Sequence, residues 1–288
     1  MFNQKILVTG ATGQLGRLVL NHLVKKVNPS NIIAMVRTPE KAAGIEALGV
    51  EVRAADYSKP ETLTTAFKGV GKVLLISSSE IGQRAEQHKN VIDAAKNAGV
   101  LLIAYTSLLH AYTSPLALAE EHIVTEADLK DSGVPFVLLR NGWYSENYLA
   151  SAATSVEHGT FLGSAGKGKI SSAAREDYAQ AAAVVLASDE SQAGKVYELA
   201  GDDSYTLADF AALISKESGK EVPYVDLPES EYKEALVGAG LPEAFAALLA
   251  DSDVGASQGG LFEDKGQLSE LIGRPTANIQ SMLKAFLA

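Results

Sequence analysis

The chain has 288 residues, a formal net charge of −10 and no cysteine. The missing cysteines exclude disulfides, cysteine-ligated zinc, iron–sulfur clusters and thiol catalysis, and the acidic charge argues against non-specific binding to nucleic acid. The first predicted strand begins within about five residues, which leaves no room for a signal peptide, and the longest apolar run, Ala181 to Ala187, is too short to cross a bilayer. We therefore expect a cytoplasmic globular protein without a membrane span.

A strand, a glycine turn and a helix are predicted near the N-terminus. Lys5 to Val8 is mainly apolar, glycines follow at 10, 13 and 16, and Gln14 to Lys26 carries leucine and valine at helical spacing. A dinucleotide pyrophosphate needs this geometry. Gly10 permits the turn, Gly13 lets backbone N–H groups approach the phosphates, and Gly16 lets the helix pack closely on the strand. The spacing resembles that of the short-chain dehydrogenase/reductase superfamily rather than the G-x-G-x-x-G of other dehydrogenases.

Arg37 follows the second predicted strand, Asn31 to Val36. In NAD-specific enzymes an Asp or Glu near this place accepts hydrogen bonds from the adenosine ribose. A guanidinium can instead grip the 2′-phosphate of NADPH in a bidentate manner. Arg37 therefore predicts NADPH as the cofactor, with NADH as a weaker one. A solvated arginine that opens the loop before Pro39 is the alternative interpretation.

Two further polar segments follow predicted strands. Asp56 comes just after the third strand, residues 50–54. In short-chain reductases an Asp at this place often accepts a hydrogen bond from the adenine amino group, and the alternative is that Asp56 caps the helix that begins near Pro60. The serines at 77–79 follow the fourth strand, residues 72–76, at the edge where ligands collect in open α/β sheets. Their small side chains would let the nicotinamide-side ribose and the phosphates lie close to the backbone. A plain serine loop is the alternative.

Strands and helices alternate from residue 5 to residue 140, which predicts an α/β fold with a Rossmann-type doubly wound parallel sheet. The remaining elements of this part are helices at 40–48, 83–98 and 115–132, strands at 101–106 and 136–140, and a loop at 107–115.

The chain beyond residue 140 is less regular. Amide and aromatic side chains gather at 141–148, where they can form one wall of a site for a flat, partly polar ring or the core of a second lobe. Residues 159–172 predict a mobile glycine-rich loop. The Rossmann domain is predicted to span 1–142 and to be completed by about 175–200, with a helix at 175–188 and a strand at 196–200. A smaller, mostly helical lobe that caps the substrate is predicted from 143–174 and 201–288, with helices at 207–218, 229–238, 242–250 and 279–287 and a strand at 221–224.

The usual proton donor of short-chain reductases is missing. These enzymes protonate the substrate oxygen with Tyr-x-x-x-Lys, but Tyr105 is followed four places later by Leu109 and Tyr144 by Tyr148. Alcohol–ketone chemistry of the usual kind is therefore disfavoured. Reduction of a quinone demands less of a general acid, because the electrons delocalise into the ring and water can protonate the product. Positioning of the acceptor against the nicotinamide could then supply most of the catalysis.

The chain resembles the NmrA-like atypical short-chain dehydrogenase/reductase family, and within it the bacterial NAD(P)H:quinone oxidoreductases of type 2. The segments that carry the resemblance run through the whole chain: TGATGQLG at 9–16, Arg37, SSSEIGQRA at 77–85, AYTSLLHA at 104–111, LLRNGWYSEN at 138–147, DSDVGASQGGLF at 251–262 and LIGRPT at 271–276. The resemblance implies NADPH as donor, a Rossmann domain with a small C-terminal lobe, and two-electron reduction of quinones without flavin. Other members of the family reduce triphenylmethane dyes, and some only bind the dinucleotide and act as redox sensors.

The resemblance also implies which residues bind. The glycine turn, through Gly10, Thr12, Gly13, Gln14 and Leu15, would hold the pyrophosphate, and Arg37 would hold the 2′-phosphate. The serines at 77–79 would lie by the nicotinamide ribose, and residues 141–147 would border cofactor and acceptor. The residues expected to bind the cofactor are Gly10, Ala11, Thr12, Gly13, Gln14, Leu15, Arg37, Asp56, Ser77, Ser78, Ser79, Thr106, Asn141, Gly142, Trp143, Tyr144, Ser145, Glu146 and Asn147. Trp143, Tyr144 and Asn147 are also expected to contact the substrate.

His122 is the candidate catalytic residue. Plant reductases of the isoflavone type carry a catalytic lysine at the start of the helix after the fifth strand, and His122 occupies the comparable place here. It could orient the ribose or donate a proton, or it could be a surface residue beside two glutamates. His88 and His110 have weaker claims. No group of histidines and carboxylates has metal-ligand spacing, so we expect no metal cofactor.

The sequence therefore predicts a flavin-free NADPH-dependent quinone oxidoreductase, with a small-molecule quinone as its partner and a homodimer left open. Two alternatives remain. One is an NADP(H)-sensing regulatory protein without turnover. The other is a reductase of a different flat acceptor, such as a triphenylmethane or azo dye.

Overall fold

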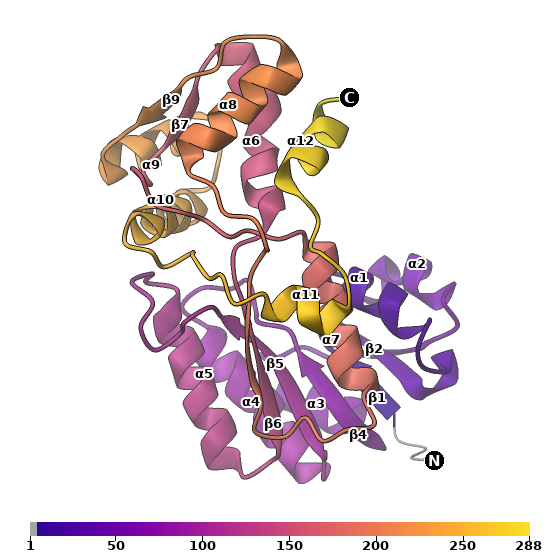
Figure 1. Cartoon of the computed structure of the whole chain (residues 1–288). Helices are drawn as coiled ribbons and strands as arrows, with labels where there is room; N and C mark the ends of the chain where they lie inside the picture. Colours follow the sequence, from indigo (N-terminus) through magenta and orange to yellow (C-terminus); the bar gives the residue numbers. More distant parts are fainter. Residues whose placement is uncertain (1–4) are drawn as a thin grey trace. The chain divides into compact units, whose positions relative to one another are not determined.

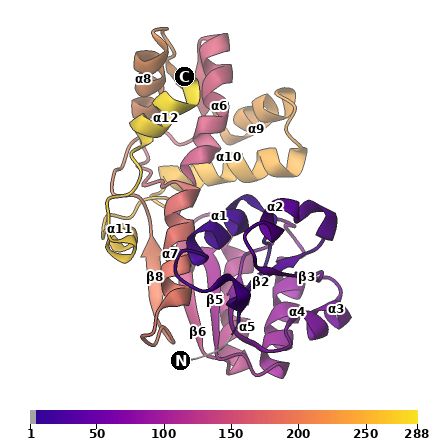
Figure 2. The same cartoon turned by 90° about the vertical axis from the view of Figure 1, so that its right-hand side faces the viewer.

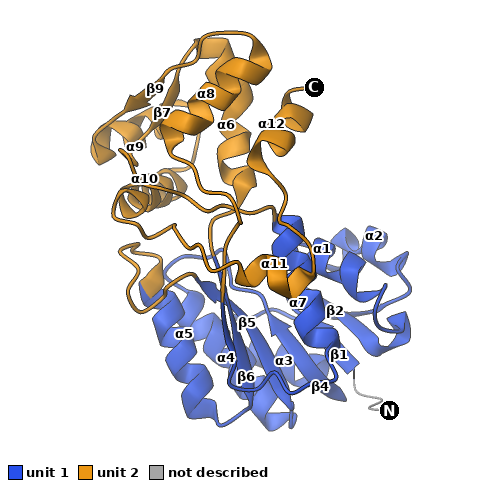
Figure 3. Ribbon diagram, in the orientation of Figure 1, with its two compact units in different colours: residues 1–108, 120–141, 175–197 blue, residues 109–119, 142–174, 198–288 orange. Residues whose placement is uncertain are grey.

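The computed structural model describes residues 5–288 and divides into two compact units. Unit 1 comprises residues 1–108, 120–141 and 175–197, and unit 2 comprises 109–119, 142–174 and 198–288 (Figure 3). Each unit is therefore assembled from three stretches of chain. Within residues 5–288 no helix is long and apolar enough to cross a membrane.

Unit 1 is built on a parallel sheet of seven strands in the order β3-β2-β1-β4-β5-β6-β8. The strands are β1 Lys5–Val8, β2 Ile32–Val36, β3 Glu51–Ala54, β4 Val70–Leu75, β5 Leu102–Leu108, β6 Phe136–Asn141 and β8 Val196–Leu199, the last of which runs across the boundary between the units. The order reverses at β1, which pairs with β2 on one side (Leu7 with Ile33) and with β4 on the other (Leu7 with Val73). Ligands of doubly wound sheets bind at such a reversal, outside the carboxyl ends of the strands.

Helices cover both faces of this sheet (Figures 1 and 2). The helices of unit 1 are α1 Gln14–Leu23, α2 Ala43–Glu46, α3 Pro60–Ala66, α4 Arg84–Asn97, α5 Ala119–Ser132 and α7 Arg175–Ala187, with 3₁₀ turns at Pro29–Asn31 and Pro39–Lys41. One buried cluster joins α3, α4 and α5 to alternate residues of the strands, among them Leu63, Ile92 and Leu129 on the helices and Ile33 and Ile103 on the strands. Residues of a strand alternate between the two faces of the sheet, so the remaining strand residues face the layer formed by α1 and α7. These two helices are joined by His22 Nε2 and Glu176 Oε1, which lie 2.7 Å apart.

The sequence of the central strands explains why they are buried. All five residues of β2 and all seven of β5 are buried, as expected for parallel strands that are covered on both faces. The apolar stripe of α1, which includes Leu15, Val19 and Leu23, is buried as its helical spacing predicts. The predicted α/β fold with a Rossmann-type doubly wound parallel sheet is thus confirmed.

Unit 2 is mostly helical and has a small parallel sheet of two strands. Its elements are α6 Ser145–His158, β7 Phe161–Gly163, α8 Leu207–Ser218, β9 Tyr224–Asp226, α9 Glu229–Gly238, α10 Glu243–Ser257, α11 Gln267–Ile272 and α12 Ile279–Leu287. β7 pairs with β9 through Phe161 and Tyr224. Rings of Phe161, Tyr205 and Tyr148 surround Phe210 at centroid distances of 5.4 to 6.1 Å and form the aromatic core of this unit.

Several predicted boundaries are wrong. The expected loop at 107–115 starts later, because β5 continues through Ser107 and Leu108, and the helix expected from Pro115 begins at Ala119. The helices α6 and α11 were not predicted, and α10 extends to Ser257.

The predicted mobile loop at 159–172 is also wrong, because it contains β7 and several buried residues. Two of its glycines, Gly163 and Gly168, serve close packing rather than mobility. A Cβ on Gly168 would lie 2.2 Å from the carbonyl oxygen of Ala256, so only glycine fits against that backbone.

Candidate functional site at the carboxyl edge of unit 1

The turn between β1 and α1 is packed too tightly for larger residues. Gly10 has φ +56°, a left-handed conformation, and its carbonyl accepts a hydrogen bond from the Gly13 N–H at 2.9 Å. A Cβ on Gly16 would lie 2.4 Å from the Gly10 carbonyl oxygen and 2.8 Å from the Ala11 Cα. The first turn of α1 therefore lies directly against the end of β1.

The N-terminus of α1 offers free backbone donors. The residue before the helix, Gly13, supplies no side-chain cap, and the first turn holds no acidic residue. The N–H groups of this turn have no carbonyl partner within the helix, and they carry the positive end of the helix dipole. Gly13 and Gln14 are exposed. This arrangement fits the phosphates of a dinucleotide.

Hydrogen bonds join the ends of neighbouring strands into one edge, which we call the carboxyl edge. Buried Thr9, after β1, accepts from the backbone N–H of Ile76, after β4, at 3.0 Å. The Tyr57 hydroxyl, after β3, donates to Thr9 Oγ1 and lies 3.0 Å from the Ile76 carbonyl. Ser77 N–H donates to Thr106 Oγ1, in β5, at 2.9 Å. The carboxyl edge thus brings together the glycine turn, Asp56 with its neighbour Tyr57, the serines and Thr106.

Arg37 follows β2 and is paired with an acid that was not predicted. Its Nη1 donates to Glu80 Oε1 at 2.5 Å, and its side chain is 66% exposed. The hydrogen bond and the charge of Glu80 raise the pKa of Arg37, and the same pair, aided by Gln87, lowers the pKa of Glu80. The sequence gives only a weak signal for this pair, because Glu80 stands 43 positions from Arg37, directly after the serines at 77–79.

Asp56 forms a local turn. Its Oδ1 accepts from the Ser58 N–H at 3.0 Å, and Lys59 precedes α3 as its cap residue. The alternative role of Asp56 as the cap of that helix is therefore wrong. Contact with adenine stays a prediction.

A buried histidine holds the serine loop. The Ser78 N–H donates to His88 Nε2 at 2.9 Å, so Nδ1 carries the proton and donates to Thr125 Oγ1 at 2.9 Å. The ring is fully buried, and this burial, with the charge of Arg84, lowers the pKa of His88 to about 3. His88 is therefore a neutral fixed acceptor at physiological pH. From the sequence, His88 has only a weak claim to a functional role, because nothing in its spacing indicates the contact with Ser78.

His122 lies inside unit 1. It is 3% exposed, and its Nδ1 lies 2.7 Å from the hydroxyl of fully buried Tyr105. The interpretation of His122 as a surface residue is wrong. Burial first, then the charges of Arg84 and His88, lower its pKa well below the usual value, so the imidazole is neutral. A catalytic role stays a prediction, and a neutral ring restricts it to hydrogen bonding or to passing on a proton.

Asn141 ends β6, opposite Leu108 in the register. It is 6% exposed, and its buried Oδ1 has no hydrogen-bond partner among the described residues. Such an unpaired oxygen costs on the order of 1–3 kcal/mol. It would be satisfied by a donor such as a carboxamide or hydroxyl group of a bound molecule.

The other predicted site residues belong to unit 2. Gly142 and Trp143 precede α6, and Tyr144, as its cap residue, forms an isolated bridge with Ala173. Trp143 is 6% exposed, with its ring 6.4 Å from that of Tyr148. These contacts agree with the alternative that Trp143 and Tyr148 belong to the core of the second lobe. The binding roles of Gly142, Trp143, Tyr144, Ser145, Glu146 and Asn147 stay predictions.

His110 also lies in unit 2, with the unusual positive φ of 53°. Its backbone N–H donates to Glu198 Oε2 at 2.8 Å, and its Nε2 lies 3.2 Å from the Phe262 carbonyl. These bonds hold a strained turn in unit 2. Within residues 5–288, no three His, Asp or Glu side chains are arranged to hold a metal ion.

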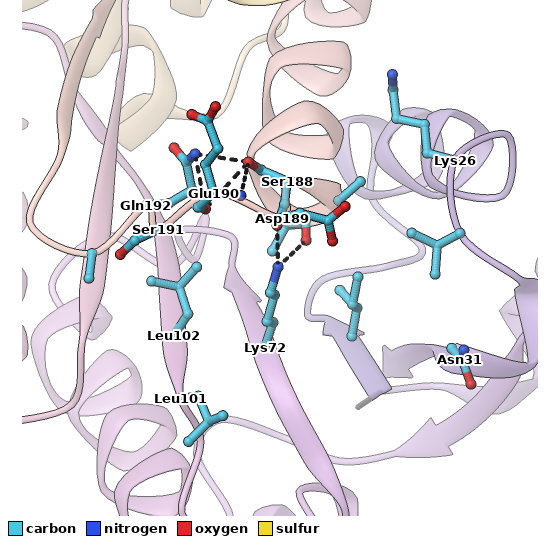
Figure 4. A pocket seen from close by; sticks show the side chains of 15 residues that line it. Lys26, Asn31, Lys72, Leu101, Leu102, Ser188, Asp189, Glu190, Ser191 and Gln192 are labelled. Atoms are coloured by element: carbon cyan, nitrogen blue, oxygen red, sulfur yellow. Dashed lines mark hydrogen bonds between the residues drawn. The ribbon is translucent and has the colours of Figure 1, made fainter. Parts of the chain in front are cut away.

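A hollow of about 670 Å³ lies at the opposite, amino-terminal edge of the sheet (Figure 4). Lys72 projects into it and donates to the carbonyls of Leu186 and Ser188, both at 2.9 Å. These carbonyls lie at the end of α7, where no further turn supplies donors. Burial lowers the pKa of Lys72. The lysine therefore stabilises the end of α7.

Comparison with known proteins identifies the family. The chain matches the NmrA-like family over residues 2–270. It is 60% identical to quinone oxidoreductase 2 of Escherichia coli over 274 residues, 95% of this chain and 96% of that protein. The crystal structure of NADPH-dependent quinone oxidoreductase from Escherichia coli complexed with NADPH superposes with a TM-score of 0.96 at 58% identity, covering 98% of this chain and 100% of that one.

A more distant relative has a different named substrate. Citrobacter sp. triphenylmethane reductase, solved in complex with NADP(H), superposes with a TM-score of 0.93 at 39% identity, over 98% of this chain and 100% of that one. The resemblance read from the sequence is confirmed. The chain belongs to the NmrA-like family and is a homologue of the NADPH-dependent quinone oxidoreductase of Escherichia coli.

Proposed function

We propose that this protein is an NADPH-dependent quinone oxidoreductase that needs no flavin. The observation that carries the proposal is the 60% identity to the Escherichia coli enzyme over 95% of this chain. The carboxyl edge of unit 1 supports it independently. Free N–H groups at the start of α1 suit a pyrophosphate, exposed Arg37 suits a 2′-phosphate, and the unpaired Oδ1 of Asn141 suits a donor group.

The residues of this edge bind and orient. Bound NADPH would supply the hydride, which with one proton converts a quinone to a hydroquinone. Gly10 and Gly16 let the first turn of α1 pack closely on the end of the glycine turn, and the bond from Ser78 to His88 fixes the loop that follows β4. Asn141 would orient a carboxamide through its Oδ1. Since Tyr105 is fully buried and has no lysine four places on, water is the better proton source for the product.

The direct test is turnover by the purified protein. With NADPH and a water-soluble benzoquinone, and without added flavin, absorbance at 340 nm should fall well above the uncatalysed rate. The visible spectrum should show no bound flavin. Absence of turnover together with tight NADPH binding would instead support the dinucleotide-sensing alternative.

Arg37→Glu should weaken NADPH binding far more than NADH binding. The variant replaces a cation beside the expected 2′-phosphate with an anion, and that phosphate carries about −1.5 to −2 charges at neutral pH. We expect a loss of roughly 100-fold for NADPH and less than about threefold for NADH in fluorescence titrations. Lys25→Glu, an equal charge reversal at an exposed position after α1, is the control. Equal losses for both cofactors would remove Arg37 from this role.

A second candidate is the reduction of another flat acceptor, which the 39% identity to the triphenylmethane reductase favours. Comparison of kcat/KM for quinones, triphenylmethane dyes and azo dyes with one cofactor decides between them. A higher kcat/KM for a dye than for every quinone would overturn the quinone assignment but keep the cofactor assignment.

A further inference from the structure

Glu80 forms a fixed anion beside the exposed end of Arg37. Its Oε1 accepts from Arg37 Nη1 at 2.5 Å, and its Oε2 accepts from Gln87 Nε2 at 2.8 Å. Gln87 is 3% exposed and donates also to Ser58 Oγ at 3.0 Å. The Glu80 N–H donates to Ser78 Oγ at 3.1 Å, which holds the backbone as well. Both oxygens of the carboxylate therefore have donors, and the side chain is held in place from its buried side.

We propose that Glu80 sets the preference of this protein between NADPH and NADH by competing with the 2′-phosphate for Arg37. This inference rests on the proposed function, since it deepens the assignment of Arg37. Unlike NAD-specific enzymes, the chain has no acid at the end of β2, but the loop after β4 delivers a carboxylate to the same place.

The competition follows from charge. A 2′-phosphate that binds Arg37 must share the guanidinium with Glu80 or replace it, and its own negative charge is repelled by the carboxylate that Gln87 keeps nearby. NADH has a hydroxyl at this position. Such a hydroxyl leaves the ion pair intact and can donate to the carboxylate. Glu80 therefore weakens NADPH binding and helps NADH binding, and Arg37 acts in the opposite direction.

Other acids near Arg37 are less suited to this role. Asp56 contributes less than Glu80 to the raised pKa of Arg37, and its Oδ1 already accepts a hydrogen bond from the Ser58 N–H. Glu80 is the first cause of that shift. Because Glu80 is half-exposed and Arg37 mostly exposed, the pair is worth little to stability, and its removal should leave the fold unchanged.

The test compares Glu80→Gln with the wild type and with Glu86→Gln. A glutamine at 80 removes the charge and keeps an oxygen that can accept from Gln87. Glu86 is exposed on α4 and has no hydrogen bond or ion pair with Arg37, so its variant controls for the change in net charge. Dissociation constants for NADPH and NADH are measured by fluorescence titration on the full chain, and thermal melting checks the fold.

We expect Glu80→Gln to tighten NADPH binding by about threefold to tenfold and to leave NADH unchanged or weaker, as removal of one exposed like charge allows. The shift should shrink at about 0.5 M salt, because exposed charges are then screened. Glu86→Gln should have no effect on the ratio. An unchanged ratio in Glu80→Gln would overturn the inference, and so would an equal change for both cofactors.

These outcomes are separable from the proposed function. A wild type that turns over quinone while Glu80→Gln keeps the wild-type ratio retains the function and overturns the role of Glu80. A wild type that binds NADPH without turnover overturns the function, whereas the ratio still decides the role of Glu80. A wild type that binds neither dinucleotide overturns both.

Discussion

Gly16 and Gly44 stand in helices only a short distance apart in the sequence, but their surroundings differ. At Gly16 a Cβ would lie 2.4 Å from a backbone oxygen that cannot move without opening the turn. At Gly44 the nearest atom is Nη1 of Arg17, at 3.5 Å, the end of a flexible side chain. The requirement for glycine is therefore set by the neighbouring backbone and not by the helix itself.

Gly16→Ala should destabilise the protein by about 2 kcal/mol and weaken NADPH binding, because the added methyl group pushes α1 away from β1. Gly44→Ala should be neutral or stabilising by up to about 1 kcal/mol, since alanine restricts the unfolded chain more than glycine does. Urea unfolding measures both effects. A Gly16→Ala variant as stable as the wild type would contradict the tight packing of this turn.

Within unit 2, a buried carboxylate ties three elements together. Asp253, on α10, is 2% exposed and accepts from the Tyr148 hydroxyl of α6 at 3.0 Å and from the Ser164 N–H, just after β7, at 2.9 Å. Burial raises the pKa of Asp253 to about 6, although the two hydrogen bonds oppose the shift. The folded unit therefore binds a proton more tightly than the unfolded chain does.

The sign of the pH effect follows from this shift. A carboxyl with a raised pKa stabilises the fold most below its unfolded pKa of about 3.8, and this contribution is lost as the pH rises through about 6. Ionisation then costs about 3 kcal/mol at pH 8. Asp253→Asn should be more stable than the wild type at pH 8, because an amide can donate to Tyr148 and accept from Ser164. The difference should vanish near pH 4.

Asp251→Asn is the matched control, because Asp251 lies on the same helix and accepts from the Ala117 N–H at 3.0 Å. Thermal melting between pH 4 and pH 8 measures both variants. A pH profile of Asp253→Asn that runs parallel to the wild type would show that Asp253 is ionised throughout.

The elements that sequence patterns could predict are those with a single regular period. β2 is a continuous apolar run, β5 begins as one at residues 102–105, and α8 and α12 have residues 207–218 and 279–287 as expected. α6 was missed because polar and aromatic residues alternate at its start and hide the helical period. β7 was missed because the glycines around it have the composition of a loop. In the structure Gly159 ends α6 in a left-handed conformation, and Gly163 and Gly168 are required by close contacts with other parts of unit 2.

The site, too, could be predicted only where it does not depend on contacts between distant parts of the chain. Gly10 and Gly16 lie close in sequence to the end of β1, and Arg37 directly follows β2, so their positions could be predicted from the order of strands and helices. Glu80 and His88 depend on contacts with Arg37 and Ser78, which only the folded arrangement of β2, β4 and α4 brings together. Spacing along one chain does not encode such pairs.

For the whole molecule, the two units should respond to acid in opposite ways. In unit 1 the lowered pKa of His88, about 3, means that stability is present above the unfolded pKa of about 6.5 and is lost as the pH falls. This loss is about 2 kcal/mol at pH 5. His122, also buried and neutral, acts in the same direction. In unit 2, protonation of Asp253 as the pH falls from 8 to 5 adds about 1 kcal/mol to the stability.

Hydrogen exchange at pH 5 and pH 8, corrected for the intrinsic exchange rates, should therefore separate the units. Amides of β4 and β5 should lose protection at pH 5, whereas those of α10 should gain it. Equal changes in both units would mean that they open as one cooperative block and that neither buried group dominates its own unit.

The three-segment construction of unit 1 has a consequence for synthesis. The edge of β6 is completed by a segment that comes much later in the chain. The Leu138 N–H donates to the Lys195 carbonyl at 3.0 Å, and the Gly194 N–H donates to the Phe136 carbonyl at 2.8 Å. While the ribosome makes the intervening residues, this apolar strand has an open edge that another nascent chain could pair with. Chains that terminate before β8 should therefore aggregate, although every element of the glycine turn and its neighbours has already been made.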